Sequence, residues 1–516
     1  MNTDNLFQNP LLEGSRSSKP IEPCALVIFG VTGDLTARKL MPALYNLAKE
    51  GLLPLHFTCT GFARREKTDE SFRKEMYEAV KKYSRSKPID ESVWENFASR
   101  LFYHHSNFDD TNGYKSLKDK LEEMDRLQNT AGNRIYYLAT QPSFFTTIIE
   151  KLSENQLIYP HKEEKKRFSR VIIEKPFGHD LNSAIALQSE ILKHLDEKQI
   201  YRIDHYLGKE TVQNLLVFRF SNLIFEAIWN QKYIDHVQIT VSEDIGIGTR
   251  GRFWEETGLL RDMIQNHLIQ LLTLIAMEPP VSLDADAIRS EKVKVLKALR
   301  PLPKDKMSDH VIRGQYDSGF VNGENVKGYK DEENVDPNSK RETFVALELA
   351  VDNWRWSGVP FYLRSGKRLP KKTTEIAIVF HHVPNNLFLQ KQKQSEQNVL
   401  SIRIQPNEGI AMNMNCKIPG IANPIQPVKM DFKYGNYFGL TPPEAYERLL
   451  CDAILGDPTL FAREDEVLTS WKFIQPILEH WEKNQDEPPA LYKAGTWGPA
   501  EAENLIARTS RKWRMI

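Results

Sequence analysis

The segment with the densest set of reactive side chains holds a carboxylate, an imidazole, a phenol and an ammonium within one short stretch. It reads Arg-Ile-Asp-His-Tyr-Leu-Gly-Lys-Glu, and the groups that could do chemistry are Asp204, His205, Tyr206 and Lys209. A solvated helix face would separate these charges from the apolar residues beside them, and this stretch has no such separation. The chemistry favours a ligand site and leaves a solvated helix face as the alternative.

A second charged group directly follows an apolar run of strand length. Val171-Ile172-Ile173 leads into Glu174-Lys175-Pro176-Phe177-Gly178. Open parallel sheets bind ligands outside the carboxyl ends of their strands. Lys175 is therefore a candidate ligand-binding residue at the end of a buried strand.

A glycine-containing turn lies between the apolar run Cys24–Phe29 and a helical pattern. Its candidate binding residues are Gly30, Thr32, Gly33, Asp34 and Leu35. Glycines at such a turn let the backbone approach a pyrophosphate, and the following helix offers free N–H groups. The spacing departs from G-x-G-x-x-G, because a threonine stands where the second glycine would be. An ordinary strand-to-helix turn is the alternative.

The end of the second strand bears on which dinucleotide is bound. Phe57–Thr60 leads through a short Gly-Phe-Ala segment to Arg64 and Arg65, and the first carboxylate is Glu66. NAD sites usually place an acidic residue here for the ribose hydroxyls, whereas a 2′-phosphate requires a cation. The pair favours NADP, and two solvated arginines are the alternative.

The order of the strands and helices that must position these groups changes near residue 200. Before it, strand candidates alternate with helical patterns: Cys24–Phe29, Phe57–Thr60, Arg134–Ala139 and Arg170–Ile173. After it, β-rich segments follow one another closely: Ile234–Val241, Thr343–Val351, Glu375–His381, Val399–Gln405, Ile410–Met414 and Val428–Phe432. One long helix is predicted over Gly258–Met277.

This change in the order of elements predicts the fold class and the domains. Alternating strands and helices are typical of an α/β parallel sheet, and closely spaced strands favour antiparallel pairing. We expect an N-terminal Rossmann-like dinucleotide-binding domain at 21–200, after a flexible tail at 1–20. A larger α+β domain with a mostly antiparallel sheet is expected to bind substrate and to dimerise over 201–516.

Composition excludes several classes of partner. The chain has 516 residues, with 69 Lys+Arg and 69 Asp+Glu, so no global positive field exists to hold a nucleic acid. The most apolar stretch, Leu268–Met277, is shorter than the roughly 20 residues that a membrane span needs. The N-terminus lacks a targeting pattern, and the four cysteines lack metal-site or disulfide spacing. We expect a cytoplasmic protein without a metal.

Taken together, the glycine turn, the Glu-Lys-Pro-Phe-Gly string and the 202–210 stretch resemble the glucose-6-phosphate dehydrogenase family. The likeness continues in the same order through 258–268, 359–367 and 403–407, and the C-terminal ending is similar to bacterial members. It implies oxidation of D-glucose 6-phosphate at C1 to 6-phospho-D-glucono-1,5-lactone, with hydride transfer to NADP. That reaction is the first step of the oxidative pentose phosphate pathway.

The resemblance also implies which residue is the base. It falls on His267, which the residues alone leave equally open between a core histidine and a base. Asp204 would orient the imidazole, and Lys175 would lie between substrate and nicotinamide, with a cis bond before Pro176. The glycine turn and Arg64 would hold NADP.

The remaining implied roles belong to the substrate. His205, Tyr206 and Lys209 match the family's phosphate ligands, while Glu243 and Asp262 match acceptors of sugar hydroxyls. Further contacts would come from three residues of the second domain: Lys367, Lys372 and Gln405. The family pairs through its large sheet, which implies a homodimer or a homotetramer. The ending lacks the vertebrate tail, so no second, structural NADP is expected.

Two alternatives remain open from the sequence. One is a dehydrogenase of broader hexose 6-phosphates that uses both NAD and NADP. The other is a catalytically silent sensor of NADP or sugar phosphates on the same fold, which would be expected to have lost the base or its partner. Neither His267 nor Asp204 is lost.

Overall fold

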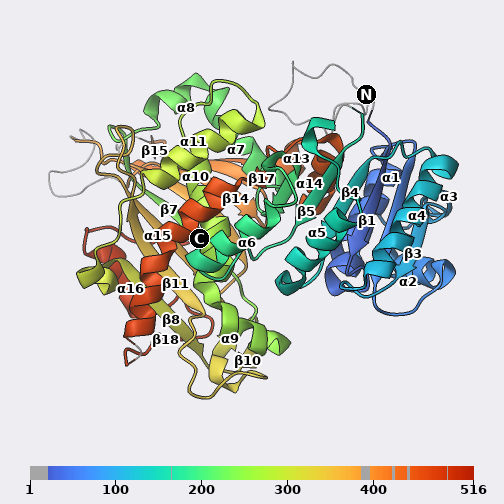
Figure 1. Ribbon diagram of the computed structural model, residues 1–516. Coiled ribbons are helices and arrows are strands. Elements are labelled where there is room, and N and C mark those ends of the chain that lie inside the picture. The colour runs from blue at the N-terminus through green and yellow to red at the C-terminus, as the bar shows by residue number, and fades with distance from the viewer. Residues whose placement is uncertain (1–20, 164–165, 385–395, 421–424, 439–441, 485) are drawn as a thin grey trace. The chain divides into compact units, whose positions relative to one another are not determined.

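The structure is a computed structural model that describes the chain except residues 1–20, 164–165, 385–395, 421–424, 439–441 and 485 (Figure 1). It contains two compact units, and neither is continuous in sequence. Unit 1 comprises the chain up to Glu210, together with Val281–Arg289 and Pro443–Leu468. Unit 2 comprises Thr211–Pro280, Ser290–Pro442 and Thr469–Ile516. The expected domain boundary at residue 200 stays a prediction.

Unit 1 is built on a seven-stranded sheet of order β17-β6-β5-β4-β1-β2-β3. Its strands are β1 Cys24–Phe29, β2 Phe57–Ala63, β3 Leu101–His105, β4 Arg134–Leu138, β5 Ser169–Ile173, β6 Ile200–Ile203 and β17 Phe461–Ala462. All neighbours are parallel except β17, which runs antiparallel to β6. Every residue of β1, β2, β4, β5 and β6 is buried, as expected of strands covered on both faces.

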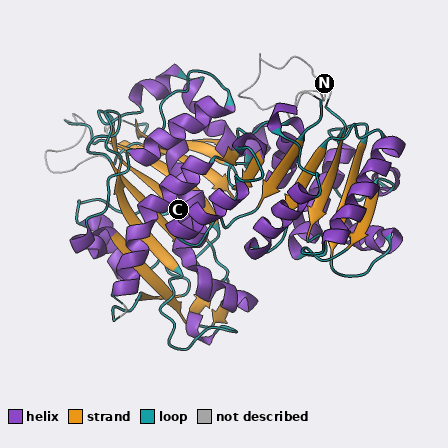
Figure 2. Ribbon diagram, viewed as in Figure 1, coloured by secondary structure: helices purple, strands orange, loops and turns teal. Residues whose placement is uncertain are grey.

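Helices pack around this sheet (Figure 2). They are η3 Thr36–Leu40, α1 Met41–Lys49, α2 Asp69–Tyr83, α3 Glu91–Ala98, α4 Thr111–Gln128, η4 Pro142–Phe144, α5 Phe145–Glu154, η5 His161–Glu163, α6 Leu181–Ile191, η6 Glu197–Gln199 and α14 Ala445–Leu455. Side-chain caps fix several starts, because an orphan backbone N–H at a helix N-terminus needs an acceptor. Thr68 accepts from the Ser71 N–H at 3.2 Å, and Asp180 accepts from the Ser183 N–H at 2.7 Å.

α14 returns to unit 1 from far along the chain and is held there by a buried carboxylate. Glu447 is fully buried and accepts from Asn46 Nδ2 at 2.8 Å and from Arg85 Nε at 2.8 Å. Arg85 Nη2 also pairs with Glu50 at 2.5 Å. A buried charge needs such partners, so this network ties α14 to α1 and to the end of α2.

Unit 2 contains a nine-stranded sheet of order β16-β15-β14-β13-β7-β12-β11-β8-β18. Its strands are β7 Ile234–Ser242, β8 Val311–Asp317, β11 Phe344–Ala350, β12 Pro360–Gly366, β13 Thr373–Phe380, β14 Val399–Gln405, β15 Gly409–Lys417, β16 Ile425–Lys433 and β18 Ala490–Lys493. Only the β12–β7 and β18–β8 pairs are parallel. A separate hairpin pairs β9 Gly319–Val321 with β10 Glu324–Val326. The parallel sheet of unit 1 and this mostly antiparallel one confirm the expected fold class.

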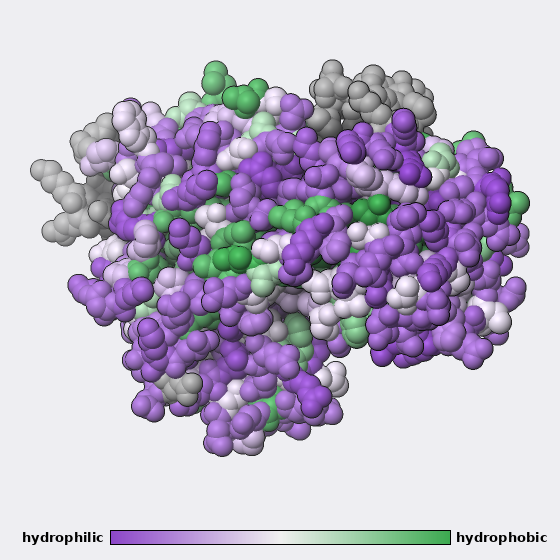
Figure 3. Space-filling view, viewed as in Figure 1, coloured by the Kyte–Doolittle hydropathy of each residue, from purple (hydrophilic) through white to green (hydrophobic). Residues whose placement is uncertain are grey.

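Three helices begin in unit 1 and continue into unit 2, namely α7, α11 and α15, and they are listed here with the helices that lie wholly in unit 2. The full set is α7 Glu210–Phe220, α8 Leu223–Ile228, η7 Gly248–Arg250, α9 Gly251–Leu259, η8 Leu260–Leu268, α10 Ile269–Ala276, α11 Ala285–Lys297, η9 Lys304–Lys306, α12 Met307–His310, η10 Tyr329–Asp331, α13 Tyr434–Phe438, α15 Glu464–Lys483 and α16 Ala500–Ala507. Within the described residues, no helix has both the length and the apolarity to cross a membrane. The face shown in Figure 3 is largely hydrophilic.

The single long helix expected over Gly258–Met277 is interrupted at its start and changes its winding along its length. Gly258 has a φ of 68° and interrupts α9, and a side chain there would overlap the Glu342 carboxyl group. After Leu259, the nine residues Leu260–Leu268 form the π-helix η8, and α10 completes the segment. The sequence pattern indicates a helix here but not its winding.

Candidate functional site

The candidate residues of unit 1 follow the carboxyl ends of its parallel strands. Gly30 follows β1, Lys175 comes soon after β5, and Asp204 follows β6. β5 and β6 are neighbours in which Ile173 pairs with Arg202. Lys175 is two residues after Ile173, and Asp204 is two residues after Arg202. Both therefore lie at the edge where open parallel sheets bind ligands.

The glycine turn allows close backbone approach. Gly30 has a φ of 80°, and a Cβ there would lie 2.5 Å from the Ala139 carbonyl oxygen. Its N–H donates to the Phe62 carbonyl at 2.8 Å, and its own carbonyl accepts from the Gly33 N–H at 2.9 Å. The turn leads into the π-helix η3 and then α1. Only glycine fits at the first position, which supports the dinucleotide interpretation over an ordinary turn.

Arg64 directly follows β2 at the same edge. Arg64 and Arg65 are both exposed, while their backbone carbonyls accept from His105 Nε2 at 3.0 Å and from the Tyr103 hydroxyl respectively. The backbone of the pair is thus held in place while the guanidinium groups face solvent. An exposed guanidinium on an anchored backbone is suited to a phosphate group.

The 204–209 segment forms a compact turn after β6. Asp204 is buried, and its Oδ1 accepts from the Tyr206 N–H at 3.0 Å. The Tyr206 carbonyl accepts from the Lys209 N–H at 3.1 Å, and the Lys209 ammonium lies 4.6 Å from the centre of the Tyr206 ring. The His205 and Tyr206 ring centres are 5.0 Å apart. The turn brings the three expected phosphate ligands together.

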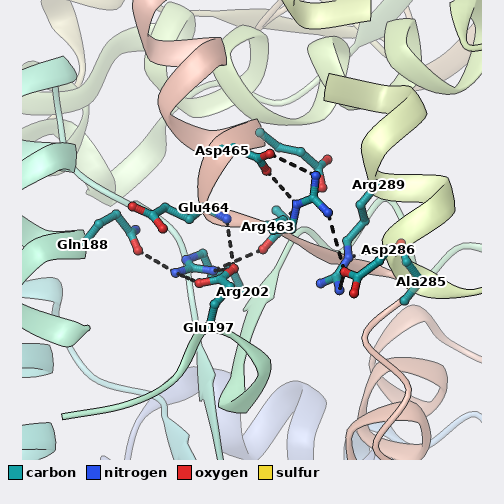
Figure 4. Close-up of polar contacts among 11 residues, drawn as sticks. Gln188, Glu197, Arg202, Ala285, Asp286, Arg289, Arg463, Glu464 and Asp465 are labelled. Carbon is teal, nitrogen blue, oxygen red and sulfur yellow. Dashed lines mark hydrogen bonds and ion pairs between the residues drawn. The ribbon is translucent and has the colours of Figure 1, made fainter. Parts of the chain in front are cut away.

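A buried arginine anchors the strand that carries this turn (Figure 4). Arg202 is fully buried, and its guanidinium donates to Glu197 at 2.6 and 2.8 Å and to Gln188 at 2.5 Å. Glu197 also accepts from the Glu464 N–H at 3.0 Å. The network joins β6 to α6, η6 and the start of α15, which fixes the backbone two residues before Asp204.

The sequence analysis missed a cluster around Glu174. The Glu174 Oε1 accepts from the Tyr137 hydroxyl at 2.5 Å and from the Tyr446 hydroxyl at 3.2 Å. Burial raises the pKa of Glu174, although both hydroxyls and Lys175 oppose the shift. Burial and this carboxylate also raise the pKa of each tyrosine. The bond between Lys175 and Pro176 is cis.

In unit 2 the expected sugar contacts gather at one edge of the sheet. β12 and β7 are parallel neighbours in which Gly366 pairs with Ser242, so Lys367 and Glu243 follow at the same level. They form an ion pair, and the Glu243 N–H donates to the Gly366 carbonyl at 3.0 Å. Lys367 is 2% exposed, with its ammonium 4.9 Å from the centre of the Trp254 ring.

Lys372 and Gln405 extend this edge across two more strands. Lys372 is exposed and immediately precedes β13, whose first residue pairs with Ser242. Gln405 is the last residue of β14 and pairs with Thr374 of β13. Four polar groups therefore follow one another along this edge of the sheet. They are the ammonium of Lys367 at β12, the carboxylate of Glu243 at β7, the ammonium of Lys372 at β13 and the amide of Gln405 at β14.

Asp262 and His267 both belong to the π-helix η8. A π-helix bonds i to i+5, so residues with this spacing stand one above the other, whereas α winding would rotate them apart. Asn266 Nδ2 donates to the Arg261 carbonyl at 3.0 Å, and Gln265 Nε2 donates to Ser470 Oγ at 2.8 Å. His267 is 1% exposed, and Asp262 is half-buried. The winding sets the two candidates on one side of the helix.

Comparison with known proteins covers nearly the whole chain. Residues 27–214 match the family model described as glucose-6-phosphate dehydrogenase, NAD binding domain, and residues 216–514 match its C-terminal domain. A glucose-6-phosphate 1-dehydrogenase of Chlamydia pneumoniae is 55% identical over 508 residues, 98% of each chain. One from Bacillus subtilis is 44% identical over 488 residues, 95% of this chain and 97% of the relative.

A solved structure described as glucose-6-phosphate dehydrogenase in complex with its substrate glucose-6-phosphate has a TM-score of 0.88. It is 38% identical and covers 97% of this chain and 100% of its own. A second, from Mycobacterium avium, has a TM-score of 0.82 at 35% identity, covering 96% and 99% of the two chains. These matches span both units.

Proposed function

The chain belongs to the glucose-6-phosphate dehydrogenase family, and we propose how its residues divide the work of that reaction. It is a glucose-6-phosphate 1-dehydrogenase that oxidises D-glucose 6-phosphate at C1 to 6-phospho-D-glucono-1,5-lactone with NADP. The observation that carries the residue assignment is the π-wound helix η8, which holds a buried histidine and a carboxylate on one side.

His267 is proposed to be the general base. The C1 hydroxyl must lose its proton as the C1–H bond gives up a hydride, and a neutral imidazole can accept that proton near pH 7. An Asp204 carboxylate that accepts a hydrogen bond from the other ring nitrogen would orient the ring and stabilise the imidazolium. Each of the two residues is buried, which supports these roles, because a hydrogen bond or charge interaction is stronger away from water.

His205, Tyr206 and Lys209 are proposed to hold the substrate phosphate. They sit in one turn, and together they supply ring donors and a cation to a group that carries nearly two negative charges. Glu243 and Asp262 are proposed to accept hydrogen bonds from sugar hydroxyls. Lys367, Lys372 and Gln405 would donate to the sugar from the strand ends.

NADP fits the carboxyl edge of the unit 1 sheet. The side-chain-free cradle at Gly30 would admit a pyrophosphate, and Thr32, Gly33, Asp34 and Leu35 would offer N–H groups and a hydroxyl. Arg64 would pair with the 2′-phosphate, and Lys175 would lie between the nicotinamide and the sugar. When bound, NADP supplies the acceptor for the hydride.

The test is the appearance of NADPH or NADH absorbance with glucose 6-phosphate, measured with NADP and NAD separately. We expect turnover with NADP and a lower kcat/KM with NAD. Folded protein without NADPH formation would contradict the assignment and favour the silent sensor. Equal kcat/KM for the two cofactors would contradict the role of Arg64 and favour the dual-cofactor alternative.

We also propose a homodimer, or a tetramer of two dimers, located in the cytoplasm. β16 is an edge strand of the large sheet, and it exposes Val428 and Met430, as α13 exposes Tyr437. An exposed apolar edge strand is a ready site for pairing. Light scattering should give a dimer or tetramer mass that Met430→Glu lowers. Cytoplasmic placement, supported by four free cysteines, is tested by cell fractionation.

A further inference from the structure

The Glu174 cluster links a carboxylate at the end of β5 to the proposed phosphate-binding turn. One carboxylate oxygen, Oε1, accepts from both the Tyr137 and Tyr446 hydroxyls, at 2.5 and 3.2 Å. The Tyr446 ring in turn stacks on the His205 imidazole, with 6.5 Å between ring centres and 7° between ring planes. A chain of contacts therefore runs from Glu174 through Tyr446 to His205.

The residues joined by hydrogen bonds in this cluster rest on anchored backbone. Tyr137 lies in the fully buried strand β4 and Glu174 directly follows β5, its parallel neighbour. Tyr446 adjoins Glu447, whose carboxylate is held by Asn46 and Arg85. The backbone anchor and the hydrogen bond fix where the Tyr446 ring lies. Because a phenolic O–H prefers the plane of its own ring, donation to Glu174 also favours one orientation of that plane.

The orientation of the Tyr446 ring plane matters for its neighbour. His205 is half-buried near the start of the turn, where an imidazole has several rotamers available. A parallel aromatic ring favours the rotamers whose ring plane matches that of Tyr446, and this limits the directions in which the ring nitrogens point. Aromatic pairs of this kind contribute about 0.5–1.5 kcal/mol.

We infer that Glu174 is a positioning residue for substrate phosphate binding, which holds Tyr446 so that its ring orients His205. The inference rests on the proposed role of His205. In this inference Glu174 acts by accepting a hydrogen bond. Its negative charge beside Lys175 is not what phosphate binding requires.

The experiment compares kcat/KM for glucose 6-phosphate with kcat/KM for glucose, which lacks the phosphate. A defect in phosphate positioning lowers the first value and leaves the second unchanged, whereas a defect in folding or in Lys175 lowers both. We expect Tyr446→Phe and Glu174→Ala each to lower the ratio by about tenfold, the scale of one hydrogen bond to a charged group. Inhibition of glucose oxidation by inorganic phosphate should weaken in parallel.

Two further variants decide the mechanism. Glu174→Gln keeps an acceptor oxygen, so we expect its ratio of kcat/KM for glucose 6-phosphate to kcat/KM for glucose to stay close to that of the parent protein. Tyr136→Phe is the matched control, because Tyr136 lies beside Tyr137 in β4 and its hydroxyl donates to the Leu157 carbonyl at 2.7 Å instead. It is expected to leave the ratio unchanged.

The outcomes separate this inference from the proposed function. If His205→Ala leaves the ratio unchanged, the phosphate role of His205 is wrong and the inference falls with it. If His205→Ala lowers the ratio but Tyr446→Phe and Glu174→Ala do not, the phosphate role of His205 stands and only the inference is overturned. Equal losses in Glu174→Gln and Glu174→Ala would also overturn it, because charge would then be the required property.

Discussion

Lys367 and Glu243 directly follow two adjacent parallel strands at the same level and form an ion pair. The lysine is 2% exposed, so its charge has little water to solvate it. Trp254 covers the ammonium on one side at 4.9 Å. A buried ammonium of this kind depends on its carboxylate partner, and the pair holds both groups at the edge where β7 and β12 end.

We expect Glu243→Gln to lower both stability and substrate affinity. The variant leaves Lys367 buried beside a neutral amide, which costs about 1–3 kcal/mol of unfolding free energy. The KM for glucose 6-phosphate should rise because Lys367 loses its fixed position. Urea unfolding and steady-state kinetics measure the two effects. Lys372→Gln is the control for stability, since that side chain is exposed; an unchanged Glu243→Gln protein would contradict the importance of the pair.

His267→Asn should lower kcat while the affinity for glucose 6-phosphate is mostly kept. A positioned base contributes about 10²–10⁴-fold, and asparagine cannot accept the C1 hydroxyl proton at neutral pH. Stopped-flow and steady-state NADPH absorbance give kcat, and equilibrium dialysis of labelled substrate gives Kd. Asn266→Ala, one position earlier in η8, controls for damage to the π-helix. If kcat moved less in His267→Asn than in this control, His267 would not be the base.

Arg64→Ala should raise the KM for NADP and leave that for NAD nearly unchanged. Only NADP carries the 2′-phosphate that a guanidinium would bind, and losing one exposed charged contact costs about 1–2 kcal/mol. The ratio of kcat/KM for the two cofactors is the readout. Arg126→Ala removes an exposed arginine near the end of α4 and should leave the ratio unchanged. A full NADP preference in Arg64→Ala would refute this role.

The stability of unit 2 should depend on Asp235 at neutral pH and lose that dependence in acid. Burial favours the neutral carboxyl, but hydrogen bonds from His236 at 2.6 Å and Arg511 at 2.9 Å outweigh it and lower the pKa of Asp235. Because the folded-state pKa is depressed, this stabilisation is present above the ordinary value of about 3.9. It is lost as the pH falls toward the lower, folded-state value.

Asp235→Asn is therefore expected to lower the unfolding free energy at pH 7 by about 1–3 kcal/mol. The difference from the parent protein should shrink steadily below pH ~4, which urea titrations at several pH values would follow. Asp119→Asn, at an exposed position of α4, should show no difference at any pH. A pH-independent loss in Asp235→Asn would mean that packing, and not charge, is responsible.

Strand positions followed from local composition because buried strands are continuous apolar runs. Cys24–Phe29 and Val399–Gln405 were predicted with the bounds that β1 and β14 have. Arg170–Ile173 falls one residue short of β5, whose first residue, Ser169, is polar but buried. Since parallel strands end at one edge, these positions were enough to group Gly30 and Lys175.

Other features depended on contacts between distant segments. The hydrogen bond between Glu174 and Tyr446 joins residues 272 positions apart, and the residues around neither one indicate the other as its partner. Lys367 and Glu243 are 124 positions apart and meet because β12 pairs parallel to β7 within a mostly antiparallel sheet. The π winding of η8 was also missed, because nine residues are only about two turns, too short a run for the side-chain pattern to separate i+4 from i+5 spacing.

The return of Pro443–Leu468 to unit 1 bears on how the protein is made. The edge strand β17 and the helix α14 are synthesised long after β6, so on the ribosome Arg85 emerges well before its partner Glu447. A nascent chain that ends before this segment carries an incomplete sheet, and Arg85 then has Glu50 but not Glu447 as a partner. Completion of the first nucleotide-binding half therefore waits for nearly the entire polypeptide to emerge.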